Sequence, residues 1–439
     1  MDRRAFLRTL AATGVTAVVP PVVMDAARLA QPGTSPHGPL LAPDENGLSL
    51  PEGFVSRIVA RSGQPVGPEG FVWHRGPDGG ATFVAGDGWI YVSNSEQAHG
   101  NGGVGAIRFG PGGEIADAYS ICSGTYSNCS GGATPWGTWL SCEEYSDGQV
   151  WECDPTGAEE PRVLPAMGVF KHEAAAVDGV RRQVYMTEDE PDGCLYRFTP
   201  VRYPDLSSGV LEVAVLTESD GTVAWVEVPD PSAEDRPTRR QVTAATRFRR
   251  GEGAGYHDGT VYFTTTGDNR VWGYDAEGGR LAVLYDADAL DDPPLRGVDN
   301  VAVSQSGDVL VAEDGDNMEL VVITADGVVA PLLRVEGDAH ADSEMTGPAF
   351  DPSGTRLYFS SQRGYGQGVT FEVSGPFQHA GAGRSDGGGR SDAGGRDLIP
   401  LGLGALGIAA VALGVGVAVR RRQVRSSGHE PVGGAGEVD

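Results

Sequence analysis

Short segments in which bulky residues alternate with small or polar ones recur along most of the chain. Each segment has a β-branched or aromatic pair, then a small residue, then polar or acidic groups, a pattern typical of half-buried strands. The six segments are 89–96, 137–144, 183–190, 260–267, 308–315 and 356–363. Steps of 48, 46, 77, 48 and 48 residues separate their central residues, which are Tyr91, Trp139, Tyr185, Tyr262, Leu310 and Tyr358. The nearly constant step indicates a structural repeat.

A repeat of this length is what propeller blades of four strands produce. Six copies predict an all-β fold, a six-bladed β-propeller over residues 48–375. The one long step predicts an insertion at about 191–250, which we expect to form a hairpin or a lid over one face. Stretches of small and apolar residues, such as Glu173–Val177 and Thr346–Phe350, precede the repeated segments. We expect them to be the innermost strands, because small residues are needed where six strands converge on an axis.

The N-terminus is typical of an exported protein. Arg3 and Arg4, followed by Phe6 and Leu7 and a mildly apolar stretch, predict a twin-arginine signal peptide over residues 1–30. An ordinary basic signal peptide is the alternative interpretation. The twin-arginine route carries folded proteins, often with their metal bound, and therefore suits a protein that holds a cofactor.

The C-terminus predicts a membrane anchor. Residues 376–397 are rich in Gly, Ser and Asp and indicate a flexible linker. Residues 398–419 form an uncharged run of 22 residues, long enough for a single transmembrane helix. The arginines that open the tail at 420–439 predict a cytoplasmic tail, with the propeller outside the cytoplasm.

Composition narrows the classes of function. The formal net charge is −27, which excludes a general nucleic-acid binder because phosphate backbones are bound by Lys and Arg. None of the five cysteines forms a CxxC pair, so a zinc ribbon is not expected. In an exported chain one or two disulfides can form, and the odd number leaves at least one free thiol.

Acidic and polar residues gather at the ends of the predicted strands, where a closed ring brings them together at the mouth. Candidate metal ligands from this pattern are Glu96, Cys129, Glu143, Glu144, Glu173, Glu188, Glu252, Asp299, Glu313 and Asp314. Crowded carboxylates in a confined cavity must be protonated or bind cations, and Ca²⁺ takes six to eight such oxygens. A Cys thiolate favours iron or zinc instead. For each single residue, solvation or pairing with an arginine is the alternative.

Few basic residues lie near these positions. Lys171, Arg296 and Arg363 are next to predicted mouth residues, where each can clamp an anionic group of a substrate or form a structural salt bridge.

The stretch from Ser127 to Glu144, SNCSGGATPWGTWLSCEE, resembles the signature of the PhoX-type alkaline phosphatase family. The resemblance continues in Lys171-His-Glu-Ala-Ala, Arg250-Gly-Glu-Gly253 and Ala312-Glu-Asp-Gly315 and ends near Gln362. It implies a twin-arginine-exported six-bladed propeller whose calcium and iron centre hydrolyses phosphate esters outside the cytoplasm. It also implies that Cys129 is an iron ligand and that Glu143, Glu144, Glu173, Glu252, Glu313 and Asp314 bind calcium or iron. Asn128 would donate a hydrogen bond to phosphate or orient the thiolate.

The leading hypothesis is therefore an extracytoplasmic, metal-dependent phosphatase that uses Ca²⁺ and Fe³⁺, with Cys129, Asn128, Lys171 and Arg363 as catalytic residues. Its partner would be a small anionic phosphate ester. The alternatives are a calcium-dependent esterase or lactonase of the propeller type and a non-catalytic, calcium-stabilised binding scaffold. Cys129→Ser separates these hypotheses, because only the iron-dependent phosphatase needs the thiolate.

Overall fold

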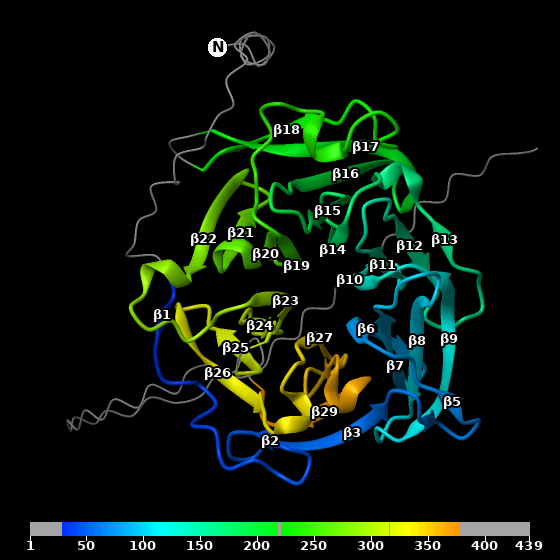
Figure 1. Cartoon of the computed structure of the whole chain (residues 1–439), viewed down its shortest axis with the longest axis vertical. Helices are drawn as coiled ribbons and strands as arrows, with labels where there is room; N and C mark the ends of the chain where they lie inside the picture. Colours follow the sequence, from blue (N-terminus) through cyan, green and yellow to red (C-terminus); the bar gives the residue numbers. More distant parts are fainter. Residues whose placement is uncertain (1–28, 218–220, 316, 378–439) are drawn as a thin grey trace, which may run out of the picture. The chain divides into compact units, whose positions relative to one another are not determined.

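The computed structural model describes residues 29–217, 221–315 and 317–377. In this part of the chain the strands form six sheets of four or more strands around a common axis, together with a small two-stranded sheet (Figure 1). The all-β, six-bladed propeller predicted from the repeat is confirmed. Each sheet runs outward from an innermost strand, and neighbouring innermost strands pack against one another around the axis.

The first three blades run in sequence order. Blade 1 contains β6 (Pro77–Ala85), β7 (Gly88–Ser95), β8 (Gly102–Phe109) and β9 (Ile115–Thr125). Blade 2 contains β10 (Asn128–Ala133), β11 (Trp139–Glu143), β12 (Val150–Cys153) and β13 (Arg162–Val163). Blade 3 contains β14 (His172–Asp178), β15 (Gln183–Glu188), β16 (Leu195–Arg202), β17 (Asp205–Leu216) and β18 (Val223–Glu227).

The other three blades complete the ring. Blade 4 contains β19 (Gly251–His257), β20 (Thr260–Thr265), β21 (Arg270–Asp275) and β22 (Arg280–Asp286). Blade 5 contains β23 (Val298–Val303), β24 (Val309–Glu313), β25 (Glu319–Ile323) and β26 (Val328–Val335), with the short strands β1 (Gln31–Pro32) and β2 (Leu48–Ser49) paired to β26. Blade 6 contains β27 (Met345–Phe350), β28 (Arg356–Ser361), β29 (Val369–Ser374) and β3 (Val55–Arg61).

The remaining elements are short. A two-stranded sheet joins β4 (Pro65–Val66) to β5 (Phe71–Val72). Single 3₁₀ turns lie in the connections, namely η2 (Pro165–Met167), η3 (Thr238–Arg240), η4 (Thr266–Asp268), η5 (Ala287–Ala289), η6 (Asp338–His340) and η7 (Gly364–Gly366).

The ring is closed by its N-terminal part. Strand β3 pairs antiparallel with β29, so the last blade takes its outermost strand from the start of the domain. This pairing ties the two ends of the domain together in one sheet, while the outermost strand of each blade remains a sheet edge.

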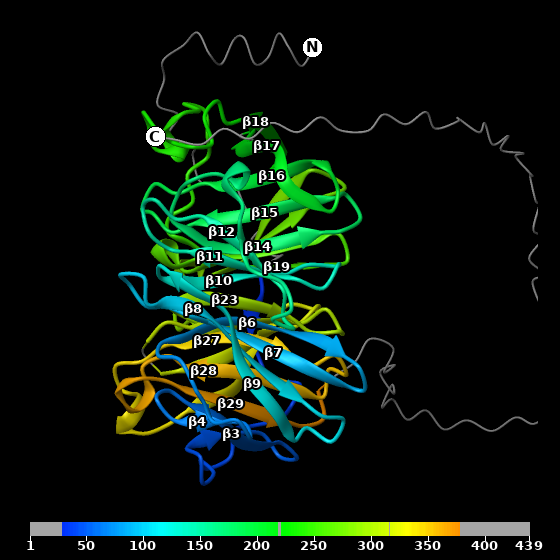
Figure 2. The ribbon, with the colours of Figure 1, turned by 90° about the vertical axis from the view of Figure 1, so that its right-hand side faces the viewer.

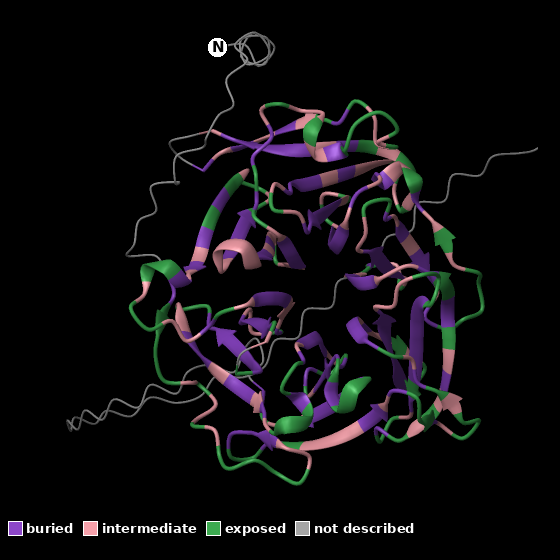
Figure 3. Cartoon of the chain, viewed as in Figure 1, coloured by how far each residue is buried: buried purple, intermediate pink, exposed green. Residues whose placement is uncertain are grey.

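The core lies between blades, where the faces of adjacent sheets meet. One cluster joins Leu310 and Leu320 of blade 5 to Leu357, Phe359 and Phe371 of blade 6. Figure 3 shows buried residues along the inner strands of the blades. The alternation of bulky and small residues in the sequence therefore reflects sheets that are buried on both faces.

Blade 3 has a fifth strand that follows directly in the chain, whereas the extra strands of blade 5 come from the N-terminal part of the domain. Within the range predicted as an insertion, β16 and β17 are ordinary blade strands, while β18 and the segment 228–250 are additional. Figures 1 and 2 both place β18 at the outer edge of the blade. The segment that follows β18 leads back to the innermost strand of blade 4 and contains η3.

Every blade has a β-bulge near the start of its innermost strand. Before the bulge, the pairs of residues that face each other are Pro77 and Ser95, Asn128 and Glu143, His172 and Glu188, Gly251 and Thr265, Val298 and Glu313, and Met345 and Ser361. These pairs fix which residues are equivalent between blades, since the register shift follows in all six.

The register corrects the sequence alignment of the first two blades. Tyr185, Tyr262, Leu310 and Tyr358 each lie three residues before the paired residue of their strand, whereas Tyr91 and Trp139 lie four before it. The equivalent residues are Val92 and Leu140, so the alignment was wrong by one residue there. It matched aromatic side chains, and a shift of one residue in a strand moves a side chain to the opposite face.

The predicted signal peptide, linker, transmembrane helix and cytoplasmic tail lie outside the described residues, apart from residues 29 and 30 of the signal and 376 and 377 of the linker. Within the described part of the chain, no helix has the length and hydropathy that crossing a bilayer requires.

Candidate metal centre on the propeller axis

The residue that directly follows each bulge pair defines an inner ring, with one member from each blade. The members of the inner ring are Asp78, Cys129, Glu173, Glu252, Asp299 and Thr346. All six are buried. In blades 1 to 5 the bulge interrupts the ladder at this residue and turns its side chain out of the regular alternation, whereas Thr346 of blade 6 still pairs with Ser360 and the bulge follows it.

Small residues make room for this arrangement. Gly79 and Gly253 follow two of the ring residues, and a Cβ atom on either would lie 2.5 or 2.6 Å from a Cα atom of the next blade. Gly347, in the same position of blade 6, has a φ of +60° and would bring a Cβ within 2.5 Å of the Asp78 carbonyl oxygen. Glycine is therefore required at these positions by close approach of the innermost strands.

A second set of polar residues follows the paired residue of each second strand. The members of this outer ring are Glu96, Glu144, Asp189, Thr266, Asp314 and Gln362. Glu344, which immediately precedes β27, lies near this ring. The two rings contain the predicted ligands except Glu143, Glu188 and Glu313, together with several residues that were not predicted as ligands.

Three groups of acidic or thiol side chains have ligand atoms within 4.8 Å of one another. They consist of Cys129, Glu144 and Glu173; of Glu173, Glu252 and Asp299; and of Asp78, Glu96 and Glu344. Glu173 belongs to two groups and so joins them. The Cys129 thiol donates to Glu173 Oε1 at 3.3 Å and lies 3.5 Å from Asp78 Oδ2, which brings the third group close to the first.

The second carboxylate oxygen of Glu173 is buried and has no hydrogen-bond partner among the residues that the structure describes. Glu173 itself is completely buried. Leaving a buried carboxylate oxygen without a partner costs free energy, and burying a charge without compensation costs more. An ion coordinated by this oxygen would remove the cost, so the donors present fit bound cations. The oxygen-rich groups suit Ca²⁺, whereas the group with the Cys129 sulfur suits a softer metal such as iron.

Burial and mutual repulsion make these acids hard to ionise without cations. Burial, followed by the charges of neighbouring carboxylates, raises the pKa of Asp78, Glu173 and Asp299 well above the usual range. Burial likewise raises the pKa of Glu144 to about 7 and those of Glu252 and Glu344 to about 8. Burial and the surrounding acids raise the pKa of the Cys129 thiol. A cation would reverse these shifts by favouring the ionised forms.

Three basic side chains form ion pairs with acids in or near the two rings. Lys171 Nζ lies 2.8 Å from Glu144 and 2.6 Å from Asp189, and Arg363 lies 2.9 Å from Glu344. Arg250, which the sequence analysis quoted in a motif but did not select, lies 2.8 Å from Asp189 and 3.2 Å from Glu252. Their side chains are 29 to 49% exposed, so an anion that approaches the mouth can reach them.

Four predicted metal ligands lie outside the groups, and three of them, Glu143, Glu188 and Glu313, bind their own blades. The carboxylate of Glu143 accepts from the backbone amides of Tyr126 and Gln149 at 2.9 and 3.2 Å. That of Glu313 accepts from the amides of Arg296 and Glu319 at 3.0 and 3.1 Å. Both residues are members of bulge pairs, and the residue after each of them is the one that reaches the outer ring.

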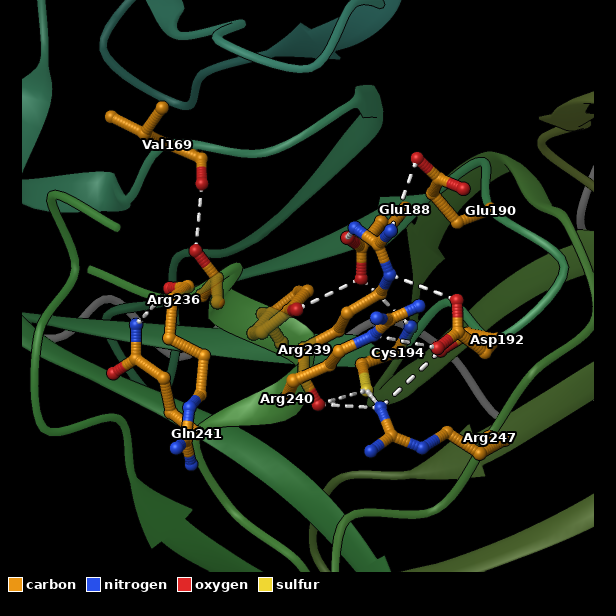
Figure 4. A network of polar contacts seen from close by, with 12 residues as sticks. Val169, Glu188, Glu190, Asp192, Cys194, Arg236, Arg239, Arg240, Gln241 and Arg247 are labelled. Atoms are coloured by element: carbon orange, nitrogen blue, oxygen red, sulfur yellow. Dashed lines mark hydrogen bonds and ion pairs between the residues drawn. The ribbon is translucent and has the colours of Figure 1, made fainter. Parts of the chain in front are cut away.

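Glu188 occupies the same position in blade 3 and is held by a polar network (Figure 4). Its carboxylate accepts from the Cys194 amide at 3.1 Å, the Tyr196 hydroxyl at 2.8 Å and Arg239 Nη1 at 3.1 Å. Arg239 also pairs with Glu190 and Asp192, which ties the segment after β18 to blade 3.

We expect Glu188→Ala to destabilise the fold without removing metal. The change takes a carboxylate away from a largely buried arginine and an amide, which should lower the free energy of unfolding by about 2–4 kcal/mol. Chemical denaturation and elemental analysis of the folded chain measure the two quantities. A loss of bound metal with unchanged stability would instead make Glu188 a ligand.

Asn128 and Asp314 also do not belong to the three groups, although the Asp314 side chain hydrogen-bonds to Glu344, a member of one of them. The side-chain amide of Asn128 is buried, donates to Ser141 Oγ at 2.9 Å and accepts from Thr125 Oγ1, so it forms part of the packing between blades 1 and 2. Asp314 is exposed, and its charge contributes to the raised pKa of Glu344, mainly a result of burial.

Asp78 and Glu344 are potential ligands that the sequence analysis did not select. Asp78 opens a stretch of small residues, Gly79 to Ala81, like those after Glu173 and Glu252. It lies 17 residues before Ser95, the partner of Pro77, whereas Cys129 lies 14 residues before Glu143, the partner of Asn128, because the β6–β7 hairpin is long. A search for the same pattern in blade 1 that accepts this longer spacing would have found Asp78.

Comparison with known families gives one match. The model of the family described as alkaline phosphatase PhoX matches residues 78–152, 145–289 and 277–364, which together span every member of the two rings. The search of curated protein sequences gave no match.

Among solved structures, the chain resembles other propellers only distantly. A gluconolactonase from Xanthomonas campestris aligns with a TM-score of 0.43 and 12% identity over 78% of this chain and 99% of its own. The PQQ domain of a pyranose dehydrogenase from Coprinopsis cinerea gives 0.44 and 12% over 79% and 100%. A calcium-binding regucalcin from Agrobacterium tumefaciens gives 0.39 and 15% over 74% and 97%. Similarities this distant say nothing about ligand or reaction.

Proposed function

The chain belongs to the PhoX alkaline phosphatase family, and we propose that it hydrolyses phosphate esters with cations held on the propeller axis. The observation that carries the proposal is the partnerless, buried Oε2 atom of Glu173, which lies where two groups of potential ligands meet. Such an atom is costly in a fold that only binds other proteins, but it is expected in a site completed by metal ions.

We assign the cations by the chemistry of their donors. Ca²⁺ suits the two all-carboxylate groups, one with Glu173, Glu252 and Asp299 and the other with Asp78, Glu96 and Glu344. Fe³⁺ suits the group in which Cys129 accompanies Glu144 and Glu173. Bound there, such ions supply electrostatic stabilisation of the phosphoryl oxygens and an acidified water.

The residues of the chain itself bind and orient the substrate. Lys171, Arg250 and Arg363 surround the acidic groups with partly exposed positive charge, which attracts an anionic phosphate to the mouth. Each forms an ion pair with a carboxylate at the mouth, so its charged end is held in place before substrate binds. Gln362 donates to both Asp78 Oδ2 at 2.7 Å and Glu96 Oε2 at 2.8 Å, and so positions two acids of one group.

A comparison of substrates tests the proposal. The chain loaded with calcium and iron should hydrolyse p-nitrophenyl phosphate, should be inhibited by inorganic phosphate as a product, and should leave lactones intact. Cys129→Ser should remove iron and the visible absorption that an iron–thiolate bond produces. Lactone hydrolysis that is indifferent to phosphate would overturn the assignment, as would a metal-loaded chain with no activity on a panel of phosphate esters.

We propose further that the enzyme acts outside the cytoplasm, held at the cell membrane by residues 398–419 after export by the twin-arginine route. The support is the sequence of the two ends, both outside the described residues. Fractionation of cells that express the chain with Arg3 and Arg4 replaced by Lys should find it retained in the cytoplasm.

A further inference from the structure

Two cysteines outside the metal centre lie together between blades 1 and 2. Cys122 is in β9, the outermost strand of blade 1, and Cys153 ends β12 of blade 2. Both are buried and belong to the same hydrophobic cluster. Their thiols are neighbours in this cluster, although the two residues are far apart in the sequence and in different sheets.

Packing holds this part of the two blades together. The Tyr119 hydroxyl of β9 donates to the Pro155 carbonyl oxygen, just after β12, at 2.9 Å. A Cβ atom on Gly157 would be in contact with the Tyr119 ring at 3.4 Å and with Ile121 at 3.7 Å. Residues shortly before Cys122 thus pack against residues shortly after Cys153, and this contact holds the two thiols near each other.

The other three thiols are separated from this pair and from one another. Cys129 is on the axis and contacts Glu173. Cys142 is in the core that blades 2 and 3 share, and Cys194 lies 3.0 Å from Arg247 Nη1 in the network of Figure 4. Among the five cysteines, all of which are in the described part of the chain, the structure brings only Cys122 and Cys153 into mutual contact.

We propose that Cys122 and Cys153 form a disulfide that joins blades 1 and 2 when the chain meets a thiol oxidant. The Cys122 thiolate attacks a disulfide of the oxidant, and the Cys153 thiolate then displaces the reduced oxidant from the mixed disulfide. The two thiols lose two protons and two electrons, and the oxidant disulfide becomes two thiols. The hydrogen bond from Cys153 lowers the pKa of Cys122, which suits Cys122 as the attacking group.

The link would close a loop around β10 and β11, the strands that carry Cys129 and precede Glu144. A disulfide stabilises mainly by restricting the unfolded chain. It would also keep Cys122 from pairing with Cys129, seven residues away, and would leave three thiols of the five.

The full-length chain tests this directly. After incubation with oxidised glutathione and removal of metals, thiols are counted in denaturant, and we expect the number to fall from five to three. Cleavage after glutamate at Glu143, Glu152 and Glu159 separates Cys153 from Cys122, Cys129 and Cys142. Mass spectrometry without reduction should then find the Cys153 peptide linked through Cys122, and the oxidised chain should melt a few degrees higher than the reduced one.

Matched variants identify the partners. Cys122→Ser should keep four thiols under both conditions, whereas Cys142→Ser, which removes another buried cysteine, should still fall from four to two. Five thiols in the oxidised wild-type chain, or a link from Cys153 to Cys129 or Cys142, would overturn the proposal. Neither result depends on phosphatase activity, so the proposed function and the disulfide fail independently.

Discussion

Replacing Glu173 with glutamine is expected to lower kcat/KM for a phosphate monoester by about 10²–10³-fold or more. Glu173 is shared by two groups of potential ligands, and its Oε2 atom has no partner in the protein. The amide keeps the size of the side chain but removes the charge that a cation needs. Steady-state kinetics with p-nitrophenyl phosphate, together with elemental analysis, measure the loss of activity and of bound metal.

Stability separates this effect from misfolding. Since burial and neighbouring acids raise the pKa of Glu173, a neutral amide there relieves repulsion, and metal-free Glu173→Gln should be at least as stable as the metal-free wild type. Glu143→Gln is the matched control, because Glu143 is a buried acid of the adjacent blade whose oxygens bind backbone amides. It should cost stability and keep activity within a few-fold. Unchanged metal content and turnover in Glu173→Gln would remove Glu173 from the centre.

Removing cations with a chelator at pH 8 is expected to lower the melting temperature by about 10 °C or more, because ions that bind only the folded chain stabilise it by mass action. Without cations, Glu144, Glu252 and Glu344 have pKa values of about 7 to 8 when folded, against a usual value of 4.5. Between about pH 4.5 and pH 7 to 8, these three acids therefore bind more protons in the folded chain than in the unfolded chain. The contribution of these three acids to the stability of the metal-free protein is therefore fully present below about pH 4.5 and is lost as the pH rises through 7 to 8.

The chelator effect should consequently grow with pH. Near pH 5 protons replace the cations at these acids, so the melting temperatures with and without chelator should lie closer together than at pH 8. Differential scanning calorimetry over this range, with calcium added back as the control, gives both curves. Equal melting temperatures at pH 8 would mean that the acids are compensated without metal, and the centre proposed here would be wrong.

Much of the fold could be predicted because its signal is local and repeated. The bulky and small residues of 183–190 or 308–315 report burial on the two faces of one strand, and a constant step between such strands needs no knowledge of long-range contacts. The number of blades follows from counting them. The error of one residue at Tyr91 and Trp139 arose where similar side chains face opposite sides of a strand, which only the pairing of β6 with β7 and of β10 with β11 resolves.

The candidate site could be predicted less completely. Cys129, Glu173, Glu252 and Asp299 were found because each lies at the start of a stretch of small and apolar residues. Glu143, Glu188 and Glu313 look the same in sequence as their neighbours Glu144, Asp189 and Asp314, yet their carboxylates bind backbone amides or, for Glu188, also Arg239. Which of two adjacent acids faces the axis depends on the β-bulge, and no residue type marks the bulge.

By itself, then, the sequence determined the class of fold, the number of blades and the gathering of acids at one end of the strands, since all three follow from periodicity along the chain. The tertiary structure alone decided that Glu344 joins the centre, that Glu173 links two groups of ligands, and that the Cys122 and Cys153 thiols meet. These facts concern side chains from different blades, and their distances are set by how six sheets close around an axis. Pairing and register establish that geometry, and neither is expressed in the pattern of any one strand.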